Sequence, residues 1–324
     1  RRQRQMCIRD SRDLEAMYKE PSYAQGILAN AYIILPYETS PTSDLATDDA
    51  VTNEISSNYL RMATGSWTAN NNPVSQWQNR FNAIQYINLF LENVDKVEWA
   101  KDERISTMFL DRLKGEAYGL RALHMYYLLR AHGGKIADGT LMGVPIILKS
   151  EGPDADFNHA RATYSDCVKQ IMEDADKAIE LLPLDYKKFA DSEIPEKYKN
   201  IGVTNASDYR RVCGEEYRGL MSGRIALAVR AQTALLAASP AFQSGSGMTW
   251  EQAADYAAEI IEKANGGGGC GLDADGLEWY TLADKDYGTG GSPAEVIWRS
   301  STDDNNTLET ANFPPSLYGN GRVN

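Results

Sequence analysis

The sequence predicts a mostly α-helical protein built from antiparallel helix pairs, with long loop-rich segments and little β-structure. Three observations support this prediction. Apolar residues recur at helical spacing in several stretches of the chain. Residues that start or stop helices flank these stretches. Polar segments rich in Gly, Asn, Asp and Tyr separate them, and they are long enough to be loops with a function of their own.

The first predicted helix covers about 75–95. Ser75 is followed three residues later by Gln78, the spacing of a capping box, in which each side chain satisfies a free backbone N–H of the other residue. The longest helix is predicted over 105–131, where Gly133 and its neighbour Gly134 supply a left-handed stop. The apolar stripes of the two helices are Trp77, Phe81, Ile84, Ile87, Leu91 and Val94, and Leu113, Ala117, Leu120, Tyr127 and Leu128.

Three more helices follow in the second half of the chain. Capping pairs mark the start of two of them, Thr163 with Asp166 and Thr249 with Gln252. Between these two lies an alanine-rich helix at 223–239, whose small residues let neighbouring helices pack closely. The succession resembles a degenerate tetratricopeptide-type array. We therefore predict a helical scaffold over about 75–264, with loops at 37–74, 185–222 and 265–324.

Composition and charge exclude several classes of protein. The chain has 324 residues, of which 43 % are hydrophobic, so it holds enough apolar material for a large core. Its net charge of -12 would repel nucleic acid and anionic membrane surfaces. Its apolar runs are far shorter than the roughly 20 residues that cross a bilayer. The four cysteines lie far apart without a CxxC pair, which favours structural thiols over a zinc site or a disulfide framework.

The two ends of the chain carry expectations of their own. Residues 1–12, RRQRQMCIRDSR, lack the apolar region of a secretory signal and resemble translated sequencing-adapter sequence. We treat them as a non-native extension and assign 13–324 to one domain. Because the sequence stops at Asn324 without a helix or a cap, we expect this domain to be incomplete at its C-terminus.

An ordered set of motifs carries a family resemblance. It begins with WQNRFNAIQYIN at 77–88 and GEAYGLRA at 115–122. It continues with Tyr126-Tyr127, Gly133-Gly134, GVPI at 143–146, Arg161 before Thr163-Tyr164, IMEDADKAIELLP at 171–183, the alanine-rich helix and EVIW at 295–298. In this order the motifs resemble the SusD/RagB family over about residues 13–318. The sequence departs from the family in an insertion, Lys135 to Met142, and in lacking the lipobox cysteine with its signal peptide and the C-terminal portion, both of which suggest truncation.

The resemblance implies a fold, a function and a partner. It implies a SusD-like α-α superhelix and a lipoprotein at the outer surface of a Gram-negative bacterium, anchored by lipid on the missing native N-terminus. Such a protein forms the lid of a SusC-like TonB-dependent transporter and holds an oligosaccharide on a face built from loops. No cofactor or metal is implied. The identity of the glycan or other nutrient stays open, because loops that set specificity vary freely on one scaffold.

Sugars offer apolar C–H faces that stack on aromatic rings and hydroxyl groups that need fixed donors and acceptors. The loop GSWTANNNPVSQW combines both requirements, with Trp67 beside Asn70, Asn71 and Asn72. The resemblance adds an acidic position near the ligand, Asp49, and a second aromatic cluster in the last loop segment. That cluster comprises Trp279, Tyr280 and Tyr287. For each residue the alternative is ordinary, since loop aromatics also close core edges and aspartates also form solvated turns.

Other residues are expected to be structural. Trp77, Trp250 and Trp298 fall on predicted helix or strand faces, which favours core packing. His124 lies within the apolar face of the longest helix, where a packed histidine is the ordinary interpretation. The Asp273-Ala-Asp275 start of a calcium loop is not completed by the residues that follow, which disfavours calcium binding without excluding it.

Three functions compete at this point. A binding module would hold a glycan without turnover. A helical glycan-active enzyme would use a carboxylate pair, which sequence does not exclude because its diagnostic is a distance in space. An interaction scaffold would bind a protein and no small ligand. The family resemblance favours the first, a non-catalytic receptor.

Overall fold

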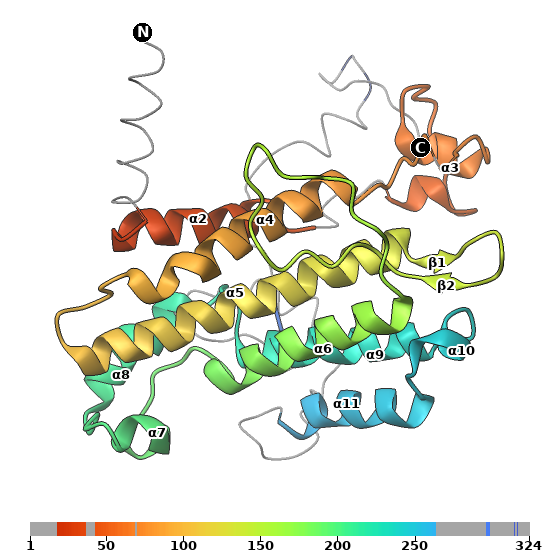
Figure 1. Cartoon of the computed structure of the whole chain (residues 1–324). Helices are drawn as coiled ribbons and strands as arrows, with labels where there is room; N and C mark the ends of the chain where they lie inside the picture. The colour runs from red at the N-terminus through yellow and green to blue at the C-terminus, as the bar shows by residue number, and fades with distance from the viewer. Residues whose placement is uncertain are drawn as a thin grey trace, which may run out of the picture.

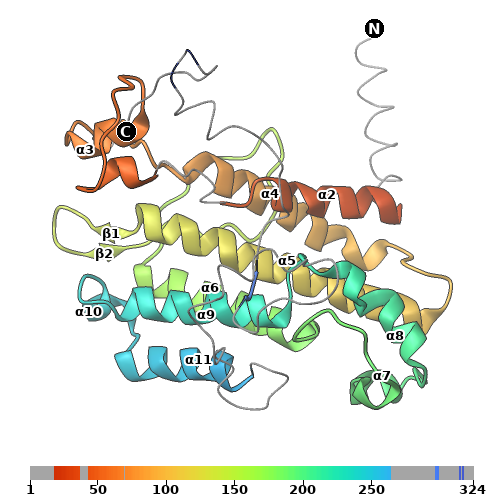
Figure 2. The same ribbon diagram turned by 180° about the vertical axis from the view of Figure 1, so that it is seen from behind.

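The computed structural model describes residues 18–36, 43–68, 70–263 and 296–298, together with Pro314 and Ser316. The helical scaffold consists of α2 (Pro21–Ile33), α4 (Trp77–Asn93), α5 (Glu103–His132), α6 (Tyr164–Leu181), α9 (Gly223–Ala238) and α11 (Trp250–Glu262). Consecutive scaffold helices run antiparallel and pack side by side, with α5 in the middle (Figures 1 and 2). The prediction of a mostly α-helical array of antiparallel pairs is confirmed.

Shorter helices and strands lie at the two ends of this array. They are η1 (Ser43–Ala46), α3 (Asn58–Ala63), η2 (Val94–Lys96), β1 (Gly134–Lys135), β2 (Leu141–Met142), η3 (Asp191–Glu193), α7 (Glu196–Lys199), α8 (Ala206–Cys213), η4 (Glu215–Tyr217) and α10 (Gln243–Ser246). The predicted insertion after Gly134 forms the antiparallel β1–β2 hairpin, in which Lys135 pairs with Leu141. None of the helices in the described ranges is both long and apolar enough to span a bilayer.

Two of the predicted helix starts are confirmed and one is wrong. The Thr163 side chain accepts a hydrogen bond from the backbone N–H of Asp166, and Thr249 forms a complete capping box with Gln252. The capping box predicted at the start of α4 is absent. There Gln76 is the N-cap and makes no side-chain capping bond, and its backbone N–H donates to the His132 ring at 3.0 Å.

The left-handed stop predicted at Gly133-Gly134 does not fall at Gly133, although the helix ends where it was expected and the next residue, Gly134, has φ 156°. Gly133 has φ -76° and extended backbone, so its role is not conformational freedom. A Cβ atom at this position would lie 2.6 Å from the Leu129 carbonyl oxygen and 2.9 Å from the Tyr164 ring. Glycine is required here because α6 begins directly against the end of α5.

The main core lies along α5, where small residues lie at the contacts with neighbouring segments. Within α5, a Cβ atom at Gly119 would lie 2.6 Å from Met221 and 3.3 Å from the Ala178 side chain of α6. Ala178 and Ala175 are themselves fully buried. The absent side chain of the glycine and the small side chains of the alanines let the two helix backbones approach closely.

The stretch 185–222, predicted as a loop, instead forms a second small core against the N-terminal half of α5. Its members are Ile105, Met108, Tyr186, Phe189, Ile194, Tyr198, Val203, Tyr209, Val212 and Cys213. The buried aromatics recur at no helical or strand period, because they come from short helices and turns. Periodicity therefore gave no signal for this part of the core.

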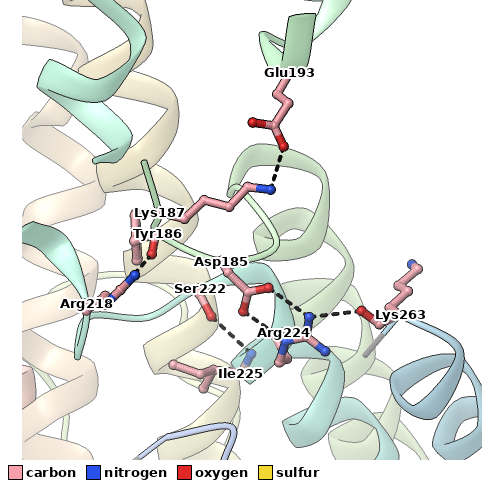
Figure 3. Close-up of polar contacts among 9 residues, drawn as sticks. All are labelled: Asp185, Tyr186, Lys187, Glu193, Arg218, Ser222, Arg224, Ile225 and Lys263. Atoms are coloured by element: carbon pink, nitrogen blue, oxygen red, sulfur yellow. Dashed lines mark hydrogen bonds and ion pairs between the residues drawn. The ribbon is translucent and has the colours of Figure 1, made fainter. Parts of the chain in front are cut away.

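Polar contacts hold the start of this stretch to the scaffold (Figure 3). Arg224, in the first turn of α9, forms a bidentate ion pair with Asp185 at 2.7 and 2.8 Å and donates to the Lys263 carbonyl. One side chain thus joins the segment after α6, the start of α9 and the residue after α11. Lys187 pairs with Glu193 beyond this junction.

His124 is a packed core histidine, as predicted. It is fully buried between two partners, the Arg80 guanidinium on α4 and the Ala31 carbonyl on α2, each at 3.0 Å. Arginine only donates, so the Nδ1 atom accepts and the Nε2 atom carries the proton. Burial, reinforced by the charge of Arg80, lowers the pKa of His124 to about 3.

The strand predicted at Trp298 and the core position predicted for Trp250 both need correction. Val296–Trp298 does not form the predicted strand, although Trp298 is partly buried against the main core and its Nε1 atom donates to the Gly219 carbonyl at 2.8 Å. Trp250 is not a core residue, since 49 % of it is exposed. It is the first residue of α11, where only Ala253 is fully buried.

Candidate functional site

The Trp67 loop belongs to a small lobe at one end of the array, which we call the loop lobe and define as residues 43–75. In both views it lies at the end that carries the β1–β2 hairpin, where α4 begins and α5 ends (Figures 1 and 2). Within the lobe, η1 packs against α3. The scaffold thus presents this loop segment at its end, away from the helix flanks.

Local hydrogen bonds determine where Trp67 lies. The Ser57 side chain caps α3 by accepting from the Tyr59 N–H. At the other end Gly65 adopts φ 65°, and the N–H groups of Gly65 and Ser66 donate to the carbonyls of Met62 and Arg61. These are the two bonds of a Schellman motif, which reverses the chain direction. Trp67 follows directly and is 49 % exposed.

The asparagines next to it form a tight turn. The backbones of Thr68 and Asn71 exchange two hydrogen bonds, at 3.0 and 3.3 Å. The Arg61 guanidinium donates to the Asn71 amide oxygen at 3.2 Å, which ties the turn back to α3. The Asn72 amide oxygen accepts from the Val74 N–H at 3.0 Å. Two of the three predicted asparagines thus shape the turn with their oxygen atoms.

The side-chain amide donors that remain free on this turn are suited to binding a polyol. The amide nitrogens of Asn71 and Asn72 keep their donors, and Asn70 makes no side-chain hydrogen bond within the described residues. Exposed Trp67 and these three asparagines lie within one short stretch of the chain, 67–72. The structure therefore brings together an apolar stacking surface and several fixed donors, the combination that a sugar ring requires.

Asp49 lies in the same lobe but takes no part in the turn. It is exposed, and its backbone N–H donates to the Thr47 hydroxyl at 3.2 Å, as in a solvated turn. No described contact joins its carboxylate to Trp67 or to the asparagines. Of the remaining predicted ligand residues, Trp279, Tyr280 and Tyr287 lie outside the described residues, as does nearly all of the segment 265–324.

The lobe is anchored where α4 begins. The Gln76 N–H donates a hydrogen bond to the His132 Nε2 atom. This atom accepts a hydrogen bond only when the imidazole is neutral. Partial burial, together with the charge of Arg161, lowers the pKa of His132. Arg161 in turn donates to the carbonyls of His132 and Gly143, at 2.8 and 2.7 Å. The anchor therefore connects the lobe, the end of α5 and the hairpin.

Trp77 was predicted as core, and this prediction is wrong. The side chain is 43 % exposed at the first position of α4, directly after the lobe. It packs edge-on against Phe81 and His132, with ring centroids 4.9 and 5.4 Å away. The stripe pattern missed this exposure because the first turn of α4 extends beyond its neighbours. A tryptophan next to a loop rich in asparagine was the available signal.

One carboxylate with a raised pKa is buried too deeply for a substrate. Glu116 on α5 is almost fully buried, accepts from the Tyr32 hydroxyl at 2.5 Å and pairs with Arg112 at 3.3 Å. Burial raises its pKa, while Arg112 and the Tyr32 hydrogen bond oppose that rise. Glu116 therefore holds α2 to α5. Within the described ranges no group of three His, Cys, Asp or Glu side chains could hold a metal ion.

The sequence matches the model of a known protein family. The SusD-like model, whose description reads "Starch-binding associating with outer membrane", matches residues 14–197. No curated protein matches the chain.

Solved structures with a similar fold come from Bacteroides. A SusD superfamily protein of Bacteroides vulgatus has a TM-score of 0.56 at 19 % identity, covering 82 % of this chain and 51 % of that one. A SusD-like protein of Bacteroides fragilis has 0.54 at 16 %, covering 76 % and 39 %. A SusD-like carbohydrate binding protein of the same organism has 0.50 at 18 %, covering 76 % and 41 %. At these identities the likeness concerns the fold alone. The chain spans about half the length of these proteins or less.

Proposed function

The chain belongs to the SusD-like family, and on that premise we propose that it binds glycans on the loop lobe without cleaving them. The observation that carries the proposal is that exposed Trp67 lies in the same short stretch as Asn70, Asn71 and Asn72, whose side-chain N–H groups donate no hydrogen bond within the described residues. The family description, which names starch binding, supports the same chemistry. Trp77 adds a second half-exposed indole where the lobe meets the scaffold.

The partner and the location belong to the same proposal. We infer that the whole protein is held at the outer-membrane surface and delivers its glycan to a SusC-like TonB-dependent transporter. The family description, which names association with the outer membrane, supports this inference.

Affinity electrophoresis of the full chain through gels containing neutral polysaccharides tests the proposal. We expect at least one polysaccharide to retard the protein and Trp67→Ala to weaken that retardation. Aromatic packing contributes about 0.5–1.5 kcal/mol beyond area burial, and the buried area adds to it, so the expected loss is about tenfold or more. Trp250→Ala is the matched control, because its indole is equally exposed on α11.

Several outcomes would contradict the proposal. Equal weakening by both tryptophan variants would indicate non-specific stacking on any exposed indole. Release of reducing ends from a retarded glycan would indicate an enzyme. A folded protein that no polysaccharide retards, but that binds a transporter, would indicate a pure interaction scaffold. Thermal melting of each variant ensures that lost binding is not lost folding.

A further inference from the structure

A groove on the flank of the array is separate from the loop lobe. It lies between α4, α5, α6 and the segment 147–149, and its volume is about 480 Å³. Pockets for small ligands have volumes of about 300–1,000 Å³. Asn88 in its wall lies eleven residues after Trp77 on α4, which places it about 16 Å along the helix axis from the lobe. The lining residues are Asn88, Leu91, Glu92, Tyr118, Arg121, Leu148, Lys149 and Lys177.

The lining includes a buried guanidinium with unused donors. Arg121, only 5 % exposed, donates from Nε and Nη2 to Asp174 at 2.7 and 2.8 Å and from Nη1 to the Asn88 amide oxygen at 3.0 Å. A guanidinium carries five N–H donors. Two of them therefore have no hydrogen-bond partner in the described part of the chain.

Two lysines add further positive charge to the lining. Lys149 and Lys177 are exposed, and neither forms an ion pair with a carboxylate of the described residues. The Lys177 ammonium lies 4.9 Å from the Tyr118 ring centroid. Lys149 is held in place because the Asn88 amide nitrogen donates to its carbonyl at 3.2 Å. The Lys177 ammonium is thus positioned beside a ring, and the backbone that carries the Lys149 side chain is fixed at the groove.

One carboxylate opposes this charge. Glu92 lies at the edge of the groove, where its two oxygen atoms accept from the N–H and the hydroxyl of Ser150, at 2.7 and 2.6 Å. Its hydrogen-bonding capacity is therefore directed at the loop. The lining carries three cations against this single carboxylate, with Asp174 beneath Arg121. In a chain of net charge -12, such a concentration of cations in a groove is a local exception.

We propose that this groove binds the oxyanion of an acidic sugar, either a carboxylate or a sulfate ester. Ammonium and guanidinium donors form the strong, charge-assisted hydrogen bonds that such groups accept. A groove in which cations outnumber carboxylates also concentrates ligands of negative charge. Leu91 and Leu148 supply apolar edges for the sugar ring. The proposal extends the glycan-binding function proposed above, because it adds acidic glycans as a ligand class at a second site.

Calorimetric titration of the full chain with trigalacturonate, 6-sulfated galactotriose and neutral galactotriose tests this proposal. We expect one of the two anionic trimers to bind about tenfold or more tightly than the neutral one, and the affinity to fall at high ionic strength. The preferred anion distinguishes a carboxylate from a sulfate ligand. Lys177→Gln and Lys149→Gln should each weaken anion binding by about tenfold.

Lys169→Gln is the matched control, since Lys169 is exposed on the same helix, outside the groove. The proposal is overturned if the control weakens binding as much as Lys177→Gln does, or if neither anionic trimer binds better than the neutral one. Its failure is distinguishable from failure of the proposed function. Retardation by neutral polysaccharides depends on Trp67 and should be unchanged in the lysine variants, so either site can fail alone.

Discussion

Removing the carboxylate of Asp174 should destabilise the whole helical array. Asp174 is fully buried on α6 and accepts two hydrogen bonds from the Arg121 guanidinium on α5, at 2.7 and 2.8 Å. Asp174→Ala leaves the Arg121 cation, which is 5 % exposed, without its anion. The same change loosens the Asn88 contact through which Arg121 supports the segment 147–149.

The magnitude follows from burial. Breaking a buried ion pair by removing one partner costs about 3–5 kcal/mol, because the remaining charge is desolvated and uncompensated. For a chain of this size a loss of 1 kcal/mol lowers the melting temperature by about 2 °C, so we expect a decrease of roughly 6–10 °C. Replacing the whole pair, Arg121→Met with Asp174→Leu, should recover most of the loss, since no buried charge is then left.

Urea unfolding followed by circular dichroism measures both variants. The matched control is Asp176→Ala, on the same helix. Asp176 also pairs with an arginine, Arg230 at 2.8 Å, but its side chain is 59 % exposed. A pair of that kind contributes only about 0–1 kcal/mol. If Asp174→Ala costs no more than Asp176→Ala, burial does not determine the strength of this contact and the reasoning is refuted.

Two further predictions concern pH and capping. His124 has a folded pKa of about 3, below its unfolded value of about 6.5, so the unfolded state binds its proton first and stability falls as pH drops below 6.5, by about 2 kcal/mol at pH 5. Urea midpoints against pH measure this slope, which should flatten in His124→Gln but persist in His159→Gln. Thr249→Ala removes the capping box of α11 and should cost about 1 kcal/mol by thermal melting, whereas Thr107→Ala on exposed α5 surface should cost less.

The amino-acid sequence determined those features that arise from residues close together in the chain. The stripes of α5 and α6 and the caps at Thr163 and Thr249 depend on contacts three or four residues apart, so their signals are legible before folding. The Asn-rich turn beside Trp67 is local for the same reason, because all of its hydrogen bonds lie within residues 57–74. The family motifs supplied the architecture into which these helices assemble.

Only the tertiary structure decided which faces of the helices are buried by neighbouring elements. Trp77 lies on the same stripe as buried Ile84 and Ile87, yet it is exposed because the neighbouring helix ends at His132. The second core at 185–222 depends on aromatics that meet only when short turns fold onto α5.

The flank groove needs three helices and a loop to bring Arg121, Lys149 and Lys177 together. Sequence patterns report the period of one element, whereas burial and the pairing of charges depend on which elements become neighbours. For that reason the scaffold of this protein was predictable from its residues, and the groove was not.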